Sequence, residues 1–235
     1  MKAYCVVLAG GVGSRMGAEI PKQFLQVCGA PIIVWTIRRI LECKVFEKIV
    51  VAIHPAWENR FLEMLCNADI DMGEMLITHG GVERHDSIKN ALDAIHGYAT
   101  VTEEDVVVIH DAVRPFVSVR MLKESIRAAS EYGACVATIP AVDTMLKVVD
   151  GCVQSVPLRS TIYHGQAPDS ARILLLEKAL SSLTPEERNV ITGTAQILVV
   201  KGIPVRAIAG DVKNIKITTP SDMEVAERYL KGQTK

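Results

Sequence analysis

A glycine-rich stretch with two nearby cations is the part of this chain whose residue types best suit chemistry. It spans residues 8–17, and a Pro-Lys-Gln block follows at 21–23. The stretch comes directly after the apolar run 4–8, which is typical of a buried strand. Glycines just past a strand let the backbone approach a phosphate chain, whose charge the exposed amides bind. With Arg15 and Lys22 as fixed positive charges, this loop is suited to hold a nucleoside triphosphate.

Two better-known phosphate loops do not fit this stretch. The P-loop ends in Gly-Lys-Ser/Thr, whereas Gly13 is followed here by serine and arginine. The dinucleotide-binding pattern requires a helix directly after the glycines, and Pro21 would interrupt such a helix. The plain alternative is a tight strand-to-helix turn that binds nothing.

A glycine pair that follows the apolar run 75–77 is a second candidate binding element. Gly80 and Gly81 would let a flat group, such as a base or a ribose, approach the backbone. If a helix starts just before Arg84, Arg84 and Ser87 are three residues apart and share one face of it. The plain alternative is a strand-to-helix loop with a surface arginine.

An acidic residue follows the continuous β-branched run 106–109. Asp111, at the carboxyl end of a central parallel strand, is well placed to hold Mg²⁺, which binds through one or two carboxylates plus substrate phosphates. Arg114 could take a second anionic group. We assign His110 a structural role, because no hydroxyl or thiol nucleophile pattern accompanies it. The alternative role for Asp111 is to cap the next helix.

Two further cations stand in less regular surroundings. Arg159 closes the block 157–159, and Lys216 lies within 214–218, a segment that the pattern predicts to be an apolar strand. A lysine turned inward there is costly unless it meets an anion. For both residues the alternative is an ordinary surface position.

Together these segments provide several cations, one candidate metal carboxylate and no nucleophile–base pair. The candidates are Arg15, Lys22, Arg114, Arg159, Lys216 and Asp111. Such a set suits a displacement at phosphorus in which a phosphate of the substrate is itself the nucleophile. The protein would then supply positioning and charge stabilisation.

The elements that position these residues follow an alternating strand–helix pattern. Strands are predicted at 4–8, 49–53, 106–109 and 134–139, and apolar stripes at helical spacing predict helices around 33–41, 88–95 and 122–129. Helical patterns resume from Ser170, and a last helix is capped by Thr219, Pro220 and Asp222. The pattern predicts an α/β fold with a doubly wound, mostly parallel sheet and ligands at the carboxyl ends of its strands.

A β-hairpin interrupts the alternation after about residue 141. The runs 146–149 and 152–156 flank Asp150 and Gly151, which favour a type I′ turn. The hairpin is too short to form its own core. We therefore expect a single domain over 1–235, with a β-arm at about 141–166 that pairs with a second subunit. The alternative is a hairpin lying flat on its own domain.

Bulk composition excludes several classes of protein. The 235 residues carry a net charge of −1, so no polybasic surface for nucleic acid or membrane is implied. The six cysteines show no Cys-x-x-Cys spacing and are expected to be reduced thiols of a cytoplasmic protein. We find neither a signal peptide nor an apolar run of the roughly 20 residues that span a bilayer.

The order and spacing of these blocks resemble one known family over nearly the whole chain. The blocks are 8–11 with 15–17, 21–23, Gly80 and Gly81 with Arg84 and Ser87, 110–115, Asp143 with Thr144, and 214–218. They look like the cytidylyltransferases of sugar-alcohol phosphates. That family includes 2-C-methyl-D-erythritol 4-phosphate cytidylyltransferases of isoprenoid biosynthesis and D-ribitol 5-phosphate cytidylyltransferases, which make CDP-ribitol for teichoic acids. The resemblance implies a Rossmann-like fold, CTP and Mg²⁺, and a homodimer whose arms reach the partner's site.

The resemblance also implies roles for individual residues. The nucleotide would be bound by Leu8, Ala9, Gly10, Gly11, Gly13, Gly80, Gly81, Arg84 and Ser87. Arg15 and Lys22 would stabilise the triphosphate and the pentacovalent transition state, and Asp111 would hold Mg²⁺. The acceptor phosphate would be bound by Arg114, Thr144, Arg159 and Lys216, and we count Arg159 and Lys216 among the catalytic residues. Thr144 and Arg159 would come from the other subunit.

The acceptor is the least determined part of this prediction. The stretches 163–168, 183–187 and 217–220 resemble the ribitol enzymes, so D-ribitol 5-phosphate is our first expectation and 2-C-methyl-D-erythritol 4-phosphate the alternative. Ala167 and Asp169 replace a usual threonine and glutamine, and Gly193 replaces a usual aspartate. The rival classes are a sugar-1-phosphate nucleotidyltransferase and a non-catalytic nucleotide-binding protein. Block 110–115 and the segment around Lys216 favour the cytidylyltransferases.

Overall fold

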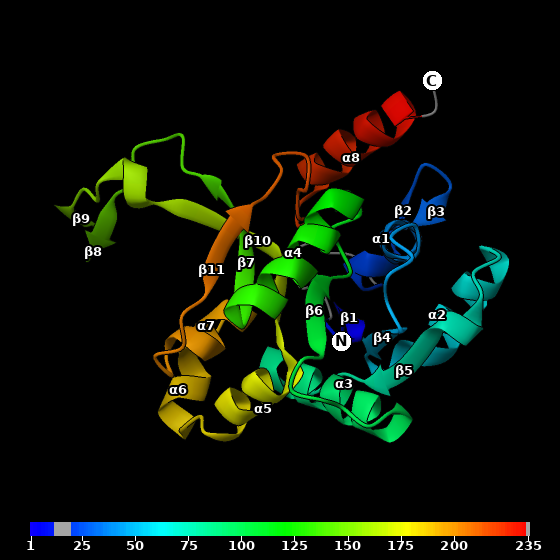
Figure 1. Ribbon diagram of the computed structural model, residues 1–235. Coiled ribbons are helices and arrows are strands. Elements are labelled where there is room, and N and C mark those ends of the chain that lie inside the picture. The colour runs from blue at the N-terminus through cyan, green and yellow to red at the C-terminus, as the bar shows by residue number, and fades with distance from the viewer. Residues whose placement is uncertain (12–19, 234–235) are drawn as a thin grey trace.

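A seven-stranded sheet forms the centre of the computed structural model, which describes residues 1–11 and 20–233 (Figure 1). Gly13 and Arg15 therefore lie outside the described residues. The strand order is β11-β7-β10-β6-β1-β4-β5. The strands are β1 (Ala3–Ala9), β4 (Lys48–Ile53), β5 (Met75–His79), β6 (Val106–Asp111), β7 (Ala134–Pro140), β10 (Tyr163–Arg172) and β11 (Arg206–Ala209). β10 runs antiparallel to β6 and β7, and the other pairs are parallel. The predicted α/β fold with a mostly parallel sheet is confirmed.

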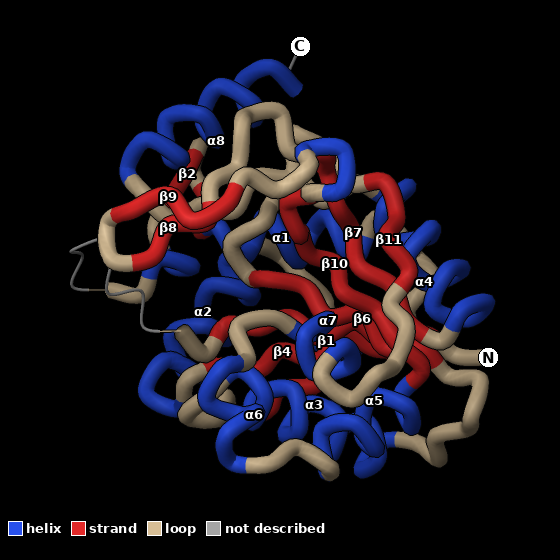
Figure 2. Tube along the Cα trace, turned by 90° about the vertical axis from the view of Figure 1, so that its left-hand side faces the viewer, coloured by secondary structure: helices blue, strands red, loops and turns tan. Residues whose placement is uncertain are grey.

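Helices cover both faces of this sheet, which explains why its central strands are almost continuously apolar. One face packs against α1 (Ile32–Leu41), α2 (Glu58–Asn67) and α4 (Val119–Tyr132). The other packs against α3 (Arg84–Tyr98), α5 (Ile173–Ser181) and α7 (Thr194–Val199), with the short α6 (Pro185–Val190) beside them (Figure 2). Val50 and Val107 are fully buried on the second face. The layers hold the carboxyl ends of β1 and β6 side by side.

The C-terminal helix α8 (Pro220–Gln233) packs outside these layers, on a third apolar cluster that includes Phe116 and Ile217. Its start agrees with the predicted cap. The backbone N–H of Thr219 donates to the Asp222 carboxylate at 2.8 Å, and the Asp222 N–H faces the Thr219 hydroxyl at 3.4 Å. Among the described residues, no helix is both long and apolar enough to cross a membrane.

Two sequence-based expectations about secondary structure are wrong. Helical structure does not resume at Ser170, because β10 continues to Arg172 and the helix begins at Ile173. Residues 214–218 are not a strand but an irregular segment, held by a hydrogen bond from the Ile217 N–H to the Val113 carbonyl. Ile217 is buried on the α8 side, whereas Lys216 ion-pairs with Asp111. The alternation of apolar and charged side chains in this segment therefore arises without a strand.

The predicted hairpin is present and stands apart from the sheet (Figure 1). β8 (Lys147–Val149) pairs antiparallel with β9 (Cys152–Ser155). Asp150 and Gly151 have φ values of 51° and 77°, as a type I′ turn requires. Every residue of both strands is exposed, which leaves the hairpin without a covered face in this chain.

The remaining described elements are short. β2 (Gln26–Val27) pairs with β3 (Ala30–Pro31), and 3₁₀ turns lie at Lys22–Phe24, Pro55–Trp57, Met72–Glu74 and Arg159–Thr161. All six cysteines are free. The turn at Lys22–Phe24 matters most for function, because it stands beside the end of β1.

Candidate active site

A buried glutamine fixes the 3₁₀ turn Lys22–Phe24 to the end of β1. The Gln23 side-chain amide donates to the Ala9 carbonyl at 2.7 Å and to the Gly11 carbonyl at 3.0 Å. Since Gln23 is held inward, its neighbour Lys22 lines a cleft of about 240 Å³ at the carboxyl ends of β1 and β6. In the sequence, Gln23 stands within a motif, but nothing in that motif shows that its side chain anchors the turn.

The glycine pair after β5 is required by close packing at the floor of this cleft. A Cβ atom on Gly80 would stand 3.1 Å from the Gly10 Cα, and one on Gly81 would stand 2.1 Å from the Asp86 Cβ. The Ser87 hydroxyl accepts a hydrogen bond from the Gly81 N–H at 3.0 Å. Gly10, Gly80, Gly81 and Ser87 are thus brought together as expected, with Ser87 already engaged in holding the turn.

Asp111, at the end of β6, is the electrostatic centre of the site. One carboxylate oxygen accepts from Arg84 Nη1 at 2.9 Å, and the other meets Arg114 Nε at 3.1 Å and Lys216 Nζ at 3.2 Å. Burial alone would raise the pKa of this carboxyl, but the positive charges of Arg84, Lys216 and Arg114 hold that pKa far below its usual range. Asp111 is therefore ionised near pH 7.

His110, beside Asp111, has a structural place, as its sequence context predicts. Its Nε2 donates to the Arg114 carbonyl at 3.0 Å and the ring is wholly buried. Burial lowers the pKa of His110 to about 4, so the ring is neutral near pH 7. It fixes the turn that carries Arg114 and does not line the cleft.

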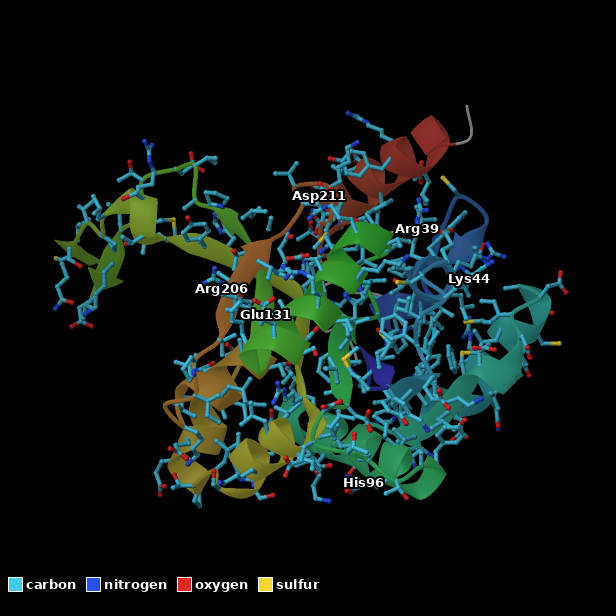
Figure 3. All side chains as sticks on the ribbon, viewed as in Figure 1. Arg39, Lys44, His96, Glu131, Arg206 and Asp211 are labelled. Atoms are coloured by element: carbon cyan, nitrogen blue, oxygen red, sulfur yellow. The ribbon has the colours of Figure 1, made fainter. Side chains whose placement is uncertain are left out.

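A network around Asn214 carries Lys216 into the site. The Asn214 side-chain amide donates to the Ala167 carbonyl at 2.7 Å, and the backbone carbonyl of Asn214 accepts from Arg114 Nη1 at 2.9 Å. The Gln166 amide donates to the carbonyl of Asp211, which lies on the segment between β11 and α8 (Figure 3). Gln166 and Asn214 are positioning residues that the sequence analysis did not single out.

A second cavity of about 290 Å³ adjoins the first and shares Arg84, Asp111 and Lys216 with it. Its other lining residues come from β7, β10 and the segment before α7: Arg114, Val136, Gly165, Gln166, Ala167, Asp169, Thr192, Gly193 and Ala195. The two cavities meet at the Asp111 cluster. Two anionic ligands bound one in each cavity would therefore face the same cations.

Asp169 is the acidic residue of the second cavity outside the Asp111 cluster. It is 8% exposed, and burial raises its pKa to about 6, although Arg84 and the hydrogen-bond donors of Thr194 oppose that shift. The sequence analysis noted Asp169 only as a departure from a family pattern. Its burial beside Arg84 depends on the antiparallel insertion of β10, which the sequence did not indicate.

Asp169→Asn is expected to change how stability depends on pH. The unfolded carboxyl titrates near 3.8 and the folded one near 6, so wild-type stability falls as the pH rises between these values. Asparagine does not titrate. Between about pH 4 and pH 7, the free energy of unfolding of the variant should therefore rise relative to that of wild type. Since one pKa unit corresponds to about 1.4 kcal/mol, the rise should reach up to about 3 kcal/mol. Urea titrations at both pH values measure this, and a constant or falling difference would contradict it.

Thr144 and Arg159 stand apart from both cavities. Both are exposed residues next to the hairpin, and Arg159 Nη1 donates to the Val142 carbonyl at 3.2 Å. Neither residue lines the cleft or its neighbour. Within one described chain, the structure thus gathers Lys22, Arg84, Asp111, Arg114 and Lys216 but not these two.

The α/β sheet with a cation-lined cleft at its carboxyl edge suits a protein that binds anionic ligands such as nucleotides, and the family match identifies that class as the nucleotidyltransferases. Within that class, the chain belongs to the 2-C-methyl-D-erythritol 4-phosphate cytidylyltransferase family, whose model matches residues 3–232. It is therefore a CTP-dependent cytidylyltransferase of the kind that acts on sugar-alcohol phosphates.

Solved structures agree with this assignment. The 2-C-methyl-D-erythritol 4-phosphate cytidylyltransferase of Francisella tularensis is 28% identical, with a TM-score of 0.79 over 97% of this chain and 99% of that one. The enzyme of the same name from Thermus thermophilus is 26% identical, with a TM-score of 0.75 over 98% and 100%. The 4-diphosphocytidyl-2C-methyl-D-erythritol synthase of Anaerococcus prevotii, 24% identical over 98% and 96%, shares the fold with a TM-score of 0.79. The expected preference for D-ribitol 5-phosphate finds no support in these comparisons.

Proposed function

We propose that this protein transfers the cytidylyl group of CTP to 2-C-methyl-D-erythritol 4-phosphate and releases pyrophosphate. The observation that carries the proposal is the meeting of two cavities at Asp111, where Arg84 and Lys216 line both cavities and Arg114 lines the second. Such an edge suits two anionic substrates that must approach each other despite their like charge. The family match supports methylerythritol phosphate, the alternative of the sequence analysis, over ribitol phosphate.

The proposed reaction needs no nucleophilic side chain. An oxygen of the acceptor phosphate forms a bond to the α-phosphorus of CTP, and the bond from that phosphorus to the bridging oxygen of the leaving pyrophosphate breaks. The attacking phosphate is already ionised near pH 7, so positioning and charge stabilisation remain for the protein. We assign Lys22 to the triphosphate and its transition state, and Arg114 and Lys216 to the acceptor phosphate.

We propose that Mg²⁺ binds mainly through the phosphates of CTP, with Asp111 as its protein carboxylate. Both Asp111 oxygens already meet cations, and the described residues hold no cluster of three histidine, cysteine or acidic side chains. Mg²⁺ commonly binds one or two carboxylates and several phosphate oxygens, so the triphosphate would supply most of its ligands. When bound, the ion would neutralise negative charge on the triphosphate.

Pyrophosphate release from CTP tests the choice of acceptor. With 2-C-methyl-D-erythritol 4-phosphate and with D-ribitol 5-phosphate at matched concentrations, we expect kcat/KM to favour the first at least about 10-fold, which needs only about 1.4 kcal/mol of discrimination. A reaction without any polyol phosphate is the control for CTP hydrolysis. A preference for ribitol 5-phosphate would keep the reaction class and reject the proposed acceptor.

We further propose that the active enzyme is a homodimer joined through the hairpin. The hairpin and its flanks expose apolar side chains that a partner would cover: Leu146, Val148, Val153, Val156 and Leu158 are between 51% and 71% exposed. An isolated two-stranded hairpin is marginal in water. A partner subunit would also place Arg159 and Thr144 against a site that they do not reach in their own chain.

Subunit mixing is expected to reveal whether Arg159 acts in the partner's site. Lys22→Ala and Arg159→Ala chains should each be nearly inactive alone. If Arg159 acts across the interface, a mixed dimer has one site with both changes and one with neither, and activity should return to about half the wild-type rate per mixed dimer. Native mass spectrometry verifies subunit exchange. Exchange without recovery would place Arg159 in its own subunit's site or outside any site.

A further inference from the structure

Asp169 occupies a wall of the second cavity that the proposed reaction leaves without a role. It stands on β10, opposite Ile109 of β6 and Val136 of β7, and is 8% exposed. The adjoining wall contains Thr192 and Gly193, and a Cβ atom on Gly193 would have no neighbour within 4 Å. A buried carboxylate thus borders open space at the place where the acceptor is expected.

The charges in this cavity indicate which part of an acceptor could face Asp169. Lys216 lines both this cavity and the first cleft, which we assign to CTP, and Arg114 contacts Asp111 at the same edge, so the acceptor phosphate belongs there. A carboxylate would repel that phosphate, and the already ionised nucleophile needs no general base. The remaining part of a polyol phosphate is its hydroxyl-bearing carbon chain.

A carboxylate can accept hydrogen bonds from the hydroxyl groups on that carbon chain. Its two oxygens can accept about four hydrogen bonds, and the donors of Thr194 act on this one from the protein. A buried carboxylate that accepts a hydrogen bond from a substrate hydroxyl discriminates strongly against analogues that lack the hydroxyl, because it is then left without that partner.

We propose that Asp169 is a specificity-determining residue, whose carboxylate accepts a hydrogen bond from a hydroxyl group of the polyol acceptor. This inference rests on the proposed function, since it requires a polyol phosphate in the second cavity. It assigns the phosphate to Arg114 and Lys216, and the recognition of the carbon chain to Asp169.

Acceptor analogues that each lack one hydroxyl group test this assignment in a double-mutant cycle. The kcat/KM of each analogue is compared with that of the intact acceptor, in wild type and in Asp169→Asn. With wild type, we expect the kcat/KM of one analogue to be about 10- to 100-fold below that of the intact acceptor, the effect of losing a hydrogen bond to a charged group. With the variant, the same analogue should show a much smaller decrease in kcat/KM. The KM for CTP should change less than about twofold, because Asp169 does not line the CTP cleft.

Two further variants separate this role from a structural one. Asp169→Gln introduces the residue usual in the resembling enzymes and should show the same loss of hydroxyl discrimination. Asp105→Asn alters a buried carboxylate that holds the Lys2 and Thr102 N–H groups outside both cavities, and it should leave that discrimination at the wild-type level.

These experiments distinguish a failure of the role proposed for Asp169 from a failure of the proposed function. The inference would be overturned if every analogue lost as much kcat/KM with both Asp169 variants as with wild type. It would also be overturned if, in the Asp169 variants, the KM for CTP rose as much as the KM for the acceptor. If wild type converts no polyol phosphate at all, the proposed function fails and the inference fails with it.

Discussion

Replacing Lys22 with alanine is expected to lower kcat about 10²- to 10³-fold, the usual cost of removing one preorganised charge contact in a transition state. Lys22 lines the cleft that we propose for CTP, because Gln23 fixes its turn to the end of β1. The charge that it meets increases as the bond to pyrophosphate breaks, so kcat should fall more than KM rises. Steady-state kinetics with CTP as the varied substrate measure both constants.

Lys89→Ala is the matched control for that change. It removes the same charge from an exposed position on α3, where Lys89 pairs with Asp93 outside the cleft. We expect its kcat to stay within about twofold of wild type, as for surface changes away from any site. If Lys22→Ala changed only KM, Lys22 would instead be an anchor for bound CTP.

Asp111→Asn is expected to destabilise the protein by about 3 kcal/mol or more and to abolish most activity. The change removes the carboxylate charge that Arg84, Arg114 and Lys216 all contact, and a largely buried cation such as Arg114 is costly without its partner. The same cations would lose the geometry that faces the two substrates. Chemical denaturation measures the first effect and pyrophosphate release the second.

Asp93→Asn provides the corresponding control on the surface. Its pair with Lys89 is exposed on both sides, so its loss should cost less than about 1 kcal/mol. If Asp111→Asn unfolded at the same denaturant concentration as wild type, the acid would not be the electrostatic centre that the contacts indicate.

Much of the fold was predictable because parallel strands buried on both faces appear as continuous β-branched runs. β4 and the first part of β6 show this signal directly. β10 was missed because Gly165 and Pro168 weaken a strand pattern and the register shifts between Gln166 and Asp169. Residues from Ile173 onward do form a helix, so the helical pattern was correct but assigned to begin too early.

The site was predictable where its residues follow one another in sequence. The turn at Asp111, the glycine pair and the block with Lys22 could be quoted as motifs, and Lys216 meets the anion that its apolar surroundings require. Pairings between distant segments could not be predicted. The sequence indicates that Arg84 binds the nucleotide, and its contact with Asp111 becomes visible only in the fold, where the start of α3 lies near the end of β6. The link from Gln166 to Asp211 joins β10 to the segment between β11 and α8 in the same way.

Cytidylyl transfer at the Asp111 cluster is tested most directly by following the α-phosphorus of CTP. The protein is mixed with Mg²⁺, 2-C-methyl-D-erythritol 4-phosphate and CTP labelled at that phosphorus. We expect the label to appear in a cytidine diphosphate ester of the acceptor, with one unlabelled pyrophosphate released per product, and ATP to give far slower transfer. Label found only in CMP, or equal rates with ATP, would contradict a cytidylyltransferase that joins two phosphates at the Asp111 cluster.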